Sequence, residues 1–230
     1  MTEFVASSTF FGVFVTLAAY LLGQAIRKRT GLALMNPLLL AIAMVMLLLG
    51  GLHIDYAAYQ QGAKLISSLL TPSTVCLAVP LYEQLHLLRR HKKAILAGVL
   101  SGVLTSLVCV LALCALLRLD HAAYVTLLPK SITTAIGMGV SEELGGHVSI
   151  TVAVIIITGI LGSVIAESVC RLFRITHPIA RGVALGASAH AIGTAKAMEL
   201  GEIEGAMSSL SLVVSGVMTV ALAPLFAPLL

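Results

Sequence analysis

The chain has 230 residues, of which 59% are hydrophobic and only 10% are charged; its mean hydropathy is +1.05 and its formal net charge is +4. Water-soluble globular proteins have about 45–50% apolar and about 25% charged residues, so most of this chain is expected to lie in lipid. The lack of tryptophan, the aromatic content of 5% and the absence of a long polar stretch argue against a nucleic-acid-binding module or a separate enzyme domain. We therefore predict one all-α polytopic membrane domain over residues 1–230.

About 20 apolar residues cross a bilayer once and a connection takes roughly five, so the chain has room for roughly seven to nine crossings or half-crossings. Asn36 is predicted to cap the second span, with Pro37 in its first turn, where a missing N–H costs nothing. Residues 53–61 are expected to form a polar loop, and Pro72 and Pro80 to interrupt the third span. The six predicted regular spans are residues 4–26, 36–52, 63–88, 94–117, 148–169 and 207–229.

Basic residues form three groups that predict the orientation of the spans, because cationic loops stay on the cytoplasmic side. The groups are residues 27–29, residues 89–93, and the looser set of Arg171, Arg174 and Arg181. The four cysteines lie in apolar runs without CxxC spacing, so we expect neither a metal nor another cofactor. No known catalytic or nucleotide-binding motif is present, so we do not expect an enzyme.

Two segments, residues 122–146 and 181–201, are too polar in their middles to be plain spanning helices. If 122–146 crossed fully, the next span would place the third basic group outside, against the positive-inside bias. A re-entrant hairpin from the outer side removes the conflict, and 181–201 then enters from the inside. Two broken segments from opposite faces are typical of inverted-repeat transporters, and the similarity of 69–73 to 127–131 supports a repeat. The alternative is that both segments are kinked full crossings.

Lys130 is the strongest candidate for a functional residue, because an ammonium in a membrane segment costs about 2.5–3.5 kcal/mol unless it faces a cavity or an anion. Ser131, Thr133 and Thr134 place hydroxyls beside it, and Pro129 interrupts the helix and frees backbone groups. Together with the N-terminus of a half-helix, these groups are suited to bind a small carboxylate. The alternative is a lysine that snorkels to the membrane interface.

His190 lies in a run of small residues, in which Gly186 and Gly193 allow helices to approach closely. Its imidazole is predicted to hydrogen-bond the substrate or to titrate during transport. Ser188 and Thr194 are predicted to add substrate-binding hydroxyls. The alternative is a buried histidine that only packs between helices.

Acidic residues near the spans are the candidates for charge balance. Glu83, next to Tyr82, is predicted to be a coupling-ion site or the charge partner of Lys130. The alternative for Glu83 is a carboxylate at the interface, near the second basic group. Glu167 and Arg171 have the spacing of an i,i+4 ion pair at a helix end.

Four motifs, by their order and spacing over nearly the whole chain, resemble those of the LrgB/CidB family of bacterial inner-membrane proteins. They are Asn36-Pro37-Leu38-Leu39, Pro80-Leu81-Tyr82-Glu83-Gln84-Leu85, Leu128-Pro129-Lys130-Ser131-Ile132-Thr133-Thr134 and Ala187-Ser188-Ala189-His190-Ala191-Ile192-Gly193-Thr194. One departure is Ala135, where the family pattern is expected to have a proline.

This resemblance implies two different functions. One is antiholin-like or holin-like regulation of murein hydrolase activity and cell lysis, together with a small LrgA/CidA-type membrane partner. The other is transport of small carboxylates such as glycolate, glycerate, pyruvate or lactate, as in the similar domain of plant plastid envelope proteins. A nonspecific membrane lesion has no evident use for Lys130, His190 and two broken segments, so the residues favour transport. We therefore predict a proton- or sodium-coupled, elevator-like carrier that works by alternating access, with a homodimer as the expected assembly.

Overall fold

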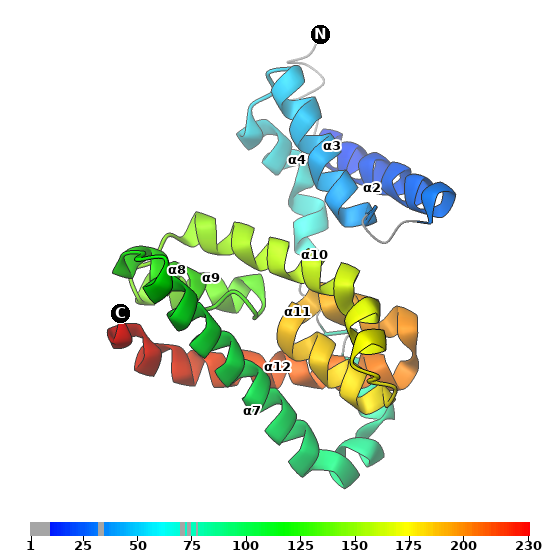
Figure 1. Ribbon diagram of the computed structural model, residues 1–230. Helices are drawn as coiled ribbons and strands as arrows, with labels where there is room; N and C mark the ends of the chain where they lie inside the picture. The colour runs from blue at the N-terminus through cyan, green and yellow to red at the C-terminus, as the bar shows by residue number, and fades with distance from the viewer. Residues whose placement is uncertain (1–9, 32–34, 70–71, 73–74, 77) are drawn as a thin grey trace. The chain divides into compact units, whose positions relative to one another are not determined.

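The computed structural model describes residues 10–31, 35–69, 72, 75–76 and 78–230, and all their regular elements are helices, as predicted (Figure 1). Contacts divide the chain into two compact units, Met1–Cys76 and Leu77–Leu230. The helices are α2 (Phe11–Thr30), α3 (Pro37–Gly51), α4 (Tyr56–Ser68), α6 (Ala78–Glu83), α7 (Leu85–Leu116), α8 (His121–Leu127), α9 (Thr134–Glu143), α10 (Val148–Leu172), α11 (Pro178–Leu200), α12 (Glu202–Phe226) and the short 3₁₀ helix η1 (Ala227–Leu229). The prediction of a single domain stays a prediction.

In the first unit, α2 packs against α3 and α4. The predicted start of α3 is confirmed: Asn36 is its N-cap, and the side chain accepts a 2.9 Å hydrogen bond from the N–H of Leu38. Pro37 occupies the first turn, where its fixed φ favours the helix. α2 ends at Gly31, whose φ of 65° is readily adopted by glycine, and the first basic group forms the last turn.

One prediction for the region after α3 is wrong in part. Of the predicted loop 53–61, only residues 53–55 are non-helical, because the Asp55 side chain accepts a hydrogen bond from Ala57 and caps α4, which begins at Tyr56. Within the predicted third run, α4 ends at Ser68 and α6 covers Ala78–Glu83. Pro72 is itself helical and the residues on either side of it lie outside the described residues, so the break predicted there stays a prediction; Pro80 lies within the first turn of α6, where proline is tolerated.

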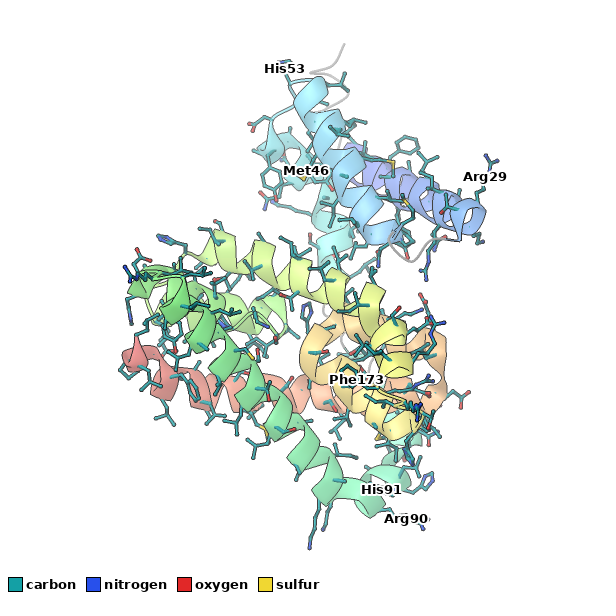
Figure 2. The ribbon with its side chains drawn as sticks, in the orientation of Figure 1. Arg29, Met46, His53, Arg90, His91 and Phe173 are labelled. Carbon is teal, nitrogen blue, oxygen red and sulfur yellow. The ribbon has the colours of Figure 1, made fainter. Side chains whose placement is uncertain are left out.

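The second unit contains three helices that are long and apolar enough to cross a membrane, which supports a membrane protein. The candidate spans are Arg89–Leu116, Val148–Leu172 and Glu202–Leu229. The second basic group, which includes Arg90 and His91, forms early turns of α7 rather than a loop (Figure 2). Side chains from α7, α8 and α12 contribute to the main core.

The first predicted broken segment is confirmed. α8 and α9 are separated by residues 128–133, which are not helical. At the start of α10, the Thr151 hydroxyl lies 2.9 Å from the carbonyl oxygen of Thr126 in α8 and 2.7 Å from the hydroxyl of Ser141 in α9. The chain therefore turns back and returns to the same end of α10. We call α8, residues 128–133 and α9 together hairpin 1.

The second predicted broken segment is also confirmed. α11 is interrupted at Ala189 and His190, whose φ/ψ angles of −124°/15° and 41°/−134° are not helical. A Cβ added at Gly193 would lie 2.6 Å from the carbonyl oxygen of Leu185, although residues eight apart in a straight helix are separated by about 12 Å. α11 therefore folds back as two short arms, visible in Figure 1, and we call it hairpin 2. Both segments therefore fold back on themselves, whereas a helix with a simple kink would continue in one direction; the re-entrant placement in a membrane stays a prediction.

Candidate functional site

The tips of the two hairpins meet at α10. Nε2 of His190, at the tip of hairpin 2, lies 2.9 Å from the carbonyl oxygen of Ile155. Gly137, near the start of α9 in hairpin 1, faces the same residue so closely that a Cβ there would collide with Cδ1 of Ile155. One residue of α10 therefore contacts both hairpins.

The two tips are also neighbours along α7. The Ser131 hydroxyl, at the tip of hairpin 1, lies 3.0 Å from the Ser106 hydroxyl of α7. In hairpin 2, Ala187 packs on Gly102 of α7, where an added Cβ would lie 3.4 Å from that of Ala187. Positions 102 and 106 are about one turn apart on the same helix face. This arrangement is expected of broken segments that enter a bundle from opposite ends.

Lys130 lies at the tip of hairpin 1 and is half-buried. Its ammonium donates a 3.0 Å hydrogen bond to the hydroxyl of Ser131, which in turn contacts Ser106. No carboxylate within the described part of the chain pairs with Lys130. Glu83 and Tyr82 are exposed in α6, and neither forms a hydrogen bond or ion pair with Lys130. An ammonium in this setting favours an anion from outside the chain.

The other predicted residues of hairpin 1 surround the start of α9. Pro129 is buried directly before Lys130, and Thr133 and Thr134 are half-buried. Thr133 is the N-cap of α9, but its side chain makes no capping hydrogen bond. The first N–H groups of a helix have no partner within the helix and carry a partial positive charge, which favours an anion at this tip.

His190 is buried against α10, with 2% of its surface exposed. Because a carbonyl only accepts hydrogen bonds, Nε2 of His190 donates to Ile155. The ring lies over Gly159, where an added Cβ would be 2.6 Å from Cε1, and Gly162 faces Ala189 at the same distance. These two glycines let the break in hairpin 2 approach α10. The role of His190 in substrate binding or titration stays a prediction.

The remaining predicted residues of hairpin 2 are not equivalent. The Thr194 hydroxyl donates to the carbonyl of His190 at 2.9 Å and therefore accepts from the hydroxyl of Ser208 in α12, also at 2.9 Å. Gly186 packs directly on the backbone of Ser208. Ser188 is exposed and donates to the carbonyl four residues earlier in its own helix. The structure therefore places Thr194 beside the break and leaves Ser188 on the outside.

Sequence reasoning missed Ser106, Ile155 and Gly159, all of which contact the hairpin tips. They lie within uninterrupted apolar runs, in which nothing marks a contact with a distant segment. The only signal for Ser106 was a hydroxyl in a spanning helix, which is common where helices pack together. The contact with Ile155 involves its backbone carbonyl, for which no side-chain pattern exists.

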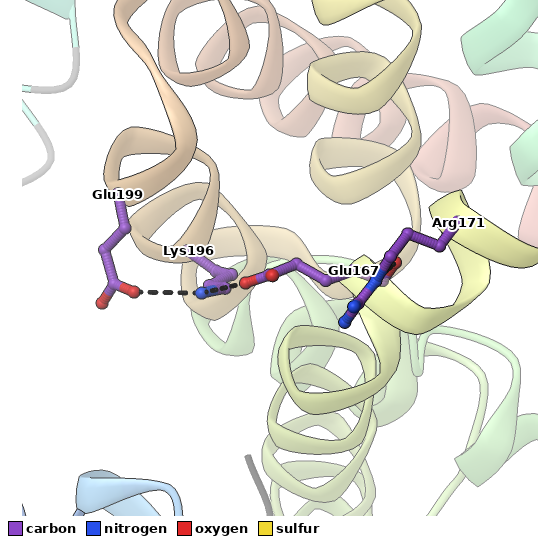
Figure 3. Close-up of polar contacts among 4 residues, drawn as sticks. All are labelled: Glu167, Arg171, Lys196 and Glu199. Atoms are coloured by element: carbon purple, nitrogen blue, oxygen red, sulfur yellow. Dashed lines mark hydrogen bonds and ion pairs between the residues drawn. The ribbon is translucent and has the colours of Figure 1, made fainter. Parts of the chain in front are cut away.

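The second arm of hairpin 2 is held to α10 by an ion cluster (Figure 3). The Lys196 ammonium lies 2.7 Å from the carboxylate of Glu167 in α10 and 3.2 Å from that of Glu199. The predicted contact between Glu167 and Arg171 is made through the backbone: Nε of Arg171 donates to the carbonyl oxygen of Glu167 at 3.4 Å, and no ion pair within 4.0 Å joins these two side chains. Lys196 fits between the two carboxylates because hairpin 2 brings its second arm back alongside α10.

Replacement of Lys196 by methionine is expected to lower the thermal unfolding temperature in detergent. The ion pairs are partly exposed and contribute about 1 kcal/mol or less each, so we expect a decrease of roughly 2–4 °C that shrinks as salt is added. The control is Lys64→Met, because Lys64 is exposed and forms no ion pair with any described residue. A salt-independent decrease, or an equal decrease in the control, would show that the cluster does not fasten hairpin 2.

Comparison with known proteins identifies the family of this architecture. Residues 16–229 match the sequence model of the LrgB-like family. This chain belongs to the LrgB-like family. It is 36% identical over 220 residues, 95% of this chain and 96% of theirs, to proteins named antiholin-like protein LrgB in Bacillus mycoides (strain KBAB4), Bacillus cereus (strain B4264) and Bacillus anthracis (strain CDC 684 / NRRL 3495). No solved structure matches this LrgB-like chain significantly. The resemblance inferred from the four motifs is thereby confirmed.

Proposed function

We propose that this protein is an antiholin-like membrane protein that restrains membrane permeabilisation and murein hydrolase activity before cell lysis. The observation that carries the proposal is the similarity over almost the full length of the chain to relatives named antiholin-like. We further propose that the protein crosses the bacterial inner membrane several times and acts with an LrgA/CidA-type membrane protein. Neither this function nor the carboxylate carriage proposed below is enzymatic.

The antiholin-like function is tested in a bacterium from which its own gene for this protein has been deleted. We expect deletion to accelerate autolysis and entry of a membrane-impermeant dye, and the restored wild-type gene to reverse both. The Lys130→Met variant is the informative control. It should restrain lysis like the wild type, because restraint by helix association does not need an ammonium at the tip of hairpin 1. Lysis kinetics that do not respond to the presence of the protein would contradict the proposal.

We propose carriage of small carboxylates as a second candidate function, because one structural observation specifically favours it. Two helical hairpins place their tips on Ile155 and on adjacent turns of α7, and a half-buried ammonium without a carboxylate partner among the described residues lies at one tip. Such tips are used by transporters to hold substrates at mid-membrane. In this proposal Lys130 anchors the carboxylate, and proton or sodium coupling drives alternating access in a homodimer. Uptake into proteoliposomes tests it.

A further inference from the structure

We propose that Ser211 of α12 is a binding residue for the carboxylate, with its hydroxyl donating to the ligand at the break in hairpin 2. This inference rests on the second candidate function. Ser211 is 0% exposed, and its hydroxyl is the single buried side-chain nitrogen or oxygen in the described chain without a hydrogen-bond partner. A buried hydroxyl left unpaired is unfavourable, and native structures rarely keep one without a reason. A ligand from outside the chain supplies the missing partner.

The first arm of hairpin 2 places Ser211 beside the break. Gly182 faces the carbonyl of Glu204, and Gly186 faces the backbone of Ser208. Both contacts have the same offset of 22 residues, so the first arm and α12 run parallel in a fixed register. Continuing this register along the arm brings Ala189, where the helical conformation ends, to the level of Ser211.

The second arm gives the same position independently. Here the register is antiparallel, because Gly205 faces Met198 and the hydroxyls of Ser208 and Thr194 lie 2.9 Å apart. Ser211, three residues after Ser208 in α12, therefore lies level with the first residues of the second arm, directly after His190. Ser208 and Ser211 are three residues apart and share one face of α12, the face that contacts the hairpin. Both arms thus place the unpaired hydroxyl at the tip.

The chemistry of this tip favours an anion over a cation. The second arm begins directly after His190, so its first N–H groups have no partner within the arm and lie at the level of Ser211. The tip of hairpin 1, with Lys130 and the N-terminus of α9, lies about one turn away along α7. A hydroxyl that donates a hydrogen bond complements these positive groups around a carboxylate.

The test measures thermal unfolding of the purified full chain in detergent with pyruvate or glycolate, against chloride at equal ionic strength. We expect both carboxylates to stabilise the wild type. In Ser211→Ala, the half-maximal concentration should rise by about tenfold or more, because a hydrogen bond to a charged group is lost. Ser215→Ala is the matched control: Ser215 is equally buried on the same face, but its hydroxyl already donates to the carbonyl of Leu212. Its half-maximal concentration should stay within about twofold of wild type.

Stability without ligand provides a second readout. Ser211→Ala removes an unpaired hydroxyl and should unfold at the wild-type temperature or above it. A marked decrease in this temperature would show that Ser211 already has a partner within the protein and would overturn the inference. Equal carboxylate affinity of Ser211→Ala and wild type would also overturn it while leaving carriage intact. A wild type stabilised by neither carboxylate would overturn both proposals.

Discussion

Replacement of Lys130 by methionine is expected to abolish saturable uptake of carboxylates into proteoliposomes that contain the purified protein. Methionine keeps an unbranched side chain but removes the ammonium, which is half-buried and held by the Ser131 hydroxyl at 3.0 Å. Loss of one partner from a buried charge pair costs about 2–5 kcal/mol, so affinity should fall by roughly thirtyfold or more. The measurement is the initial rate of uptake of labelled glycolate, pyruvate and lactate, with and without a pH gradient.

The matched control for this experiment is Lys64→Met, which removes the same charge from an exposed position in α4. This variant should transport like the wild type. Wild-type uptake by Lys130→Met would remove Lys130 from the mechanism. Leakage of every solute through both variants would favour a holin-like lesion over a carrier. If the Lys130→Met variant fails in uptake but still restrains lysis, the two proposed functions are separable in one protein.

Replacement of Gly186 by alanine is expected to destabilise the protein strongly, because the added methyl group would collide with the backbone of Ser208 in α12. Backbone atoms of a packed helix cannot rotate away as a flexible side chain can, so hairpin 2 has to shift. Overpacking of this kind costs about 1–3 kcal/mol and sometimes more. We expect a lower unfolding temperature in detergent and a lower yield from the membrane. The shift also moves the break in hairpin 2, so carboxylate binding should weaken.

Gly139→Ala is the control for this substitution, since Gly139 also lies in a helix but has no atom within 4 Å of an added Cβ. Alanine there should stabilise the protein by about 0.5–1 kcal/mol, because it is the better helix former. The contrast between the two variants isolates packing from helix propensity. Similar unfolding temperatures for both would show that the contact between hairpin 2 and α12 is looser than the structure indicates.

The local features that the sequence predicted correctly all depend on neighbours in the chain. Asn36 and Pro37 specify the start of α3 because a cap needs only its own side chain and the next N–H groups. The prediction of a loop is wrong for residues 56–61, because polar composition alone favours a loop whereas Asp55 caps a helix that begins at Tyr56.

Apolar composition and the polar middles of two segments were sufficient to predict an all-α membrane protein with two broken helices, because helix length and the cost of polar groups in lipid are local properties. The sequence also indicated Lys130 and His190, since an intramembrane ionisable group stands out by itself. Only the tertiary structure showed that both hairpins contact Ile155, that Glu83 forms no ion pair with Lys130, and that the Ser211 hydroxyl has no partner among the described residues. These facts depend on the register between helices, which close contacts at glycines determine and which no periodicity within one helix encodes.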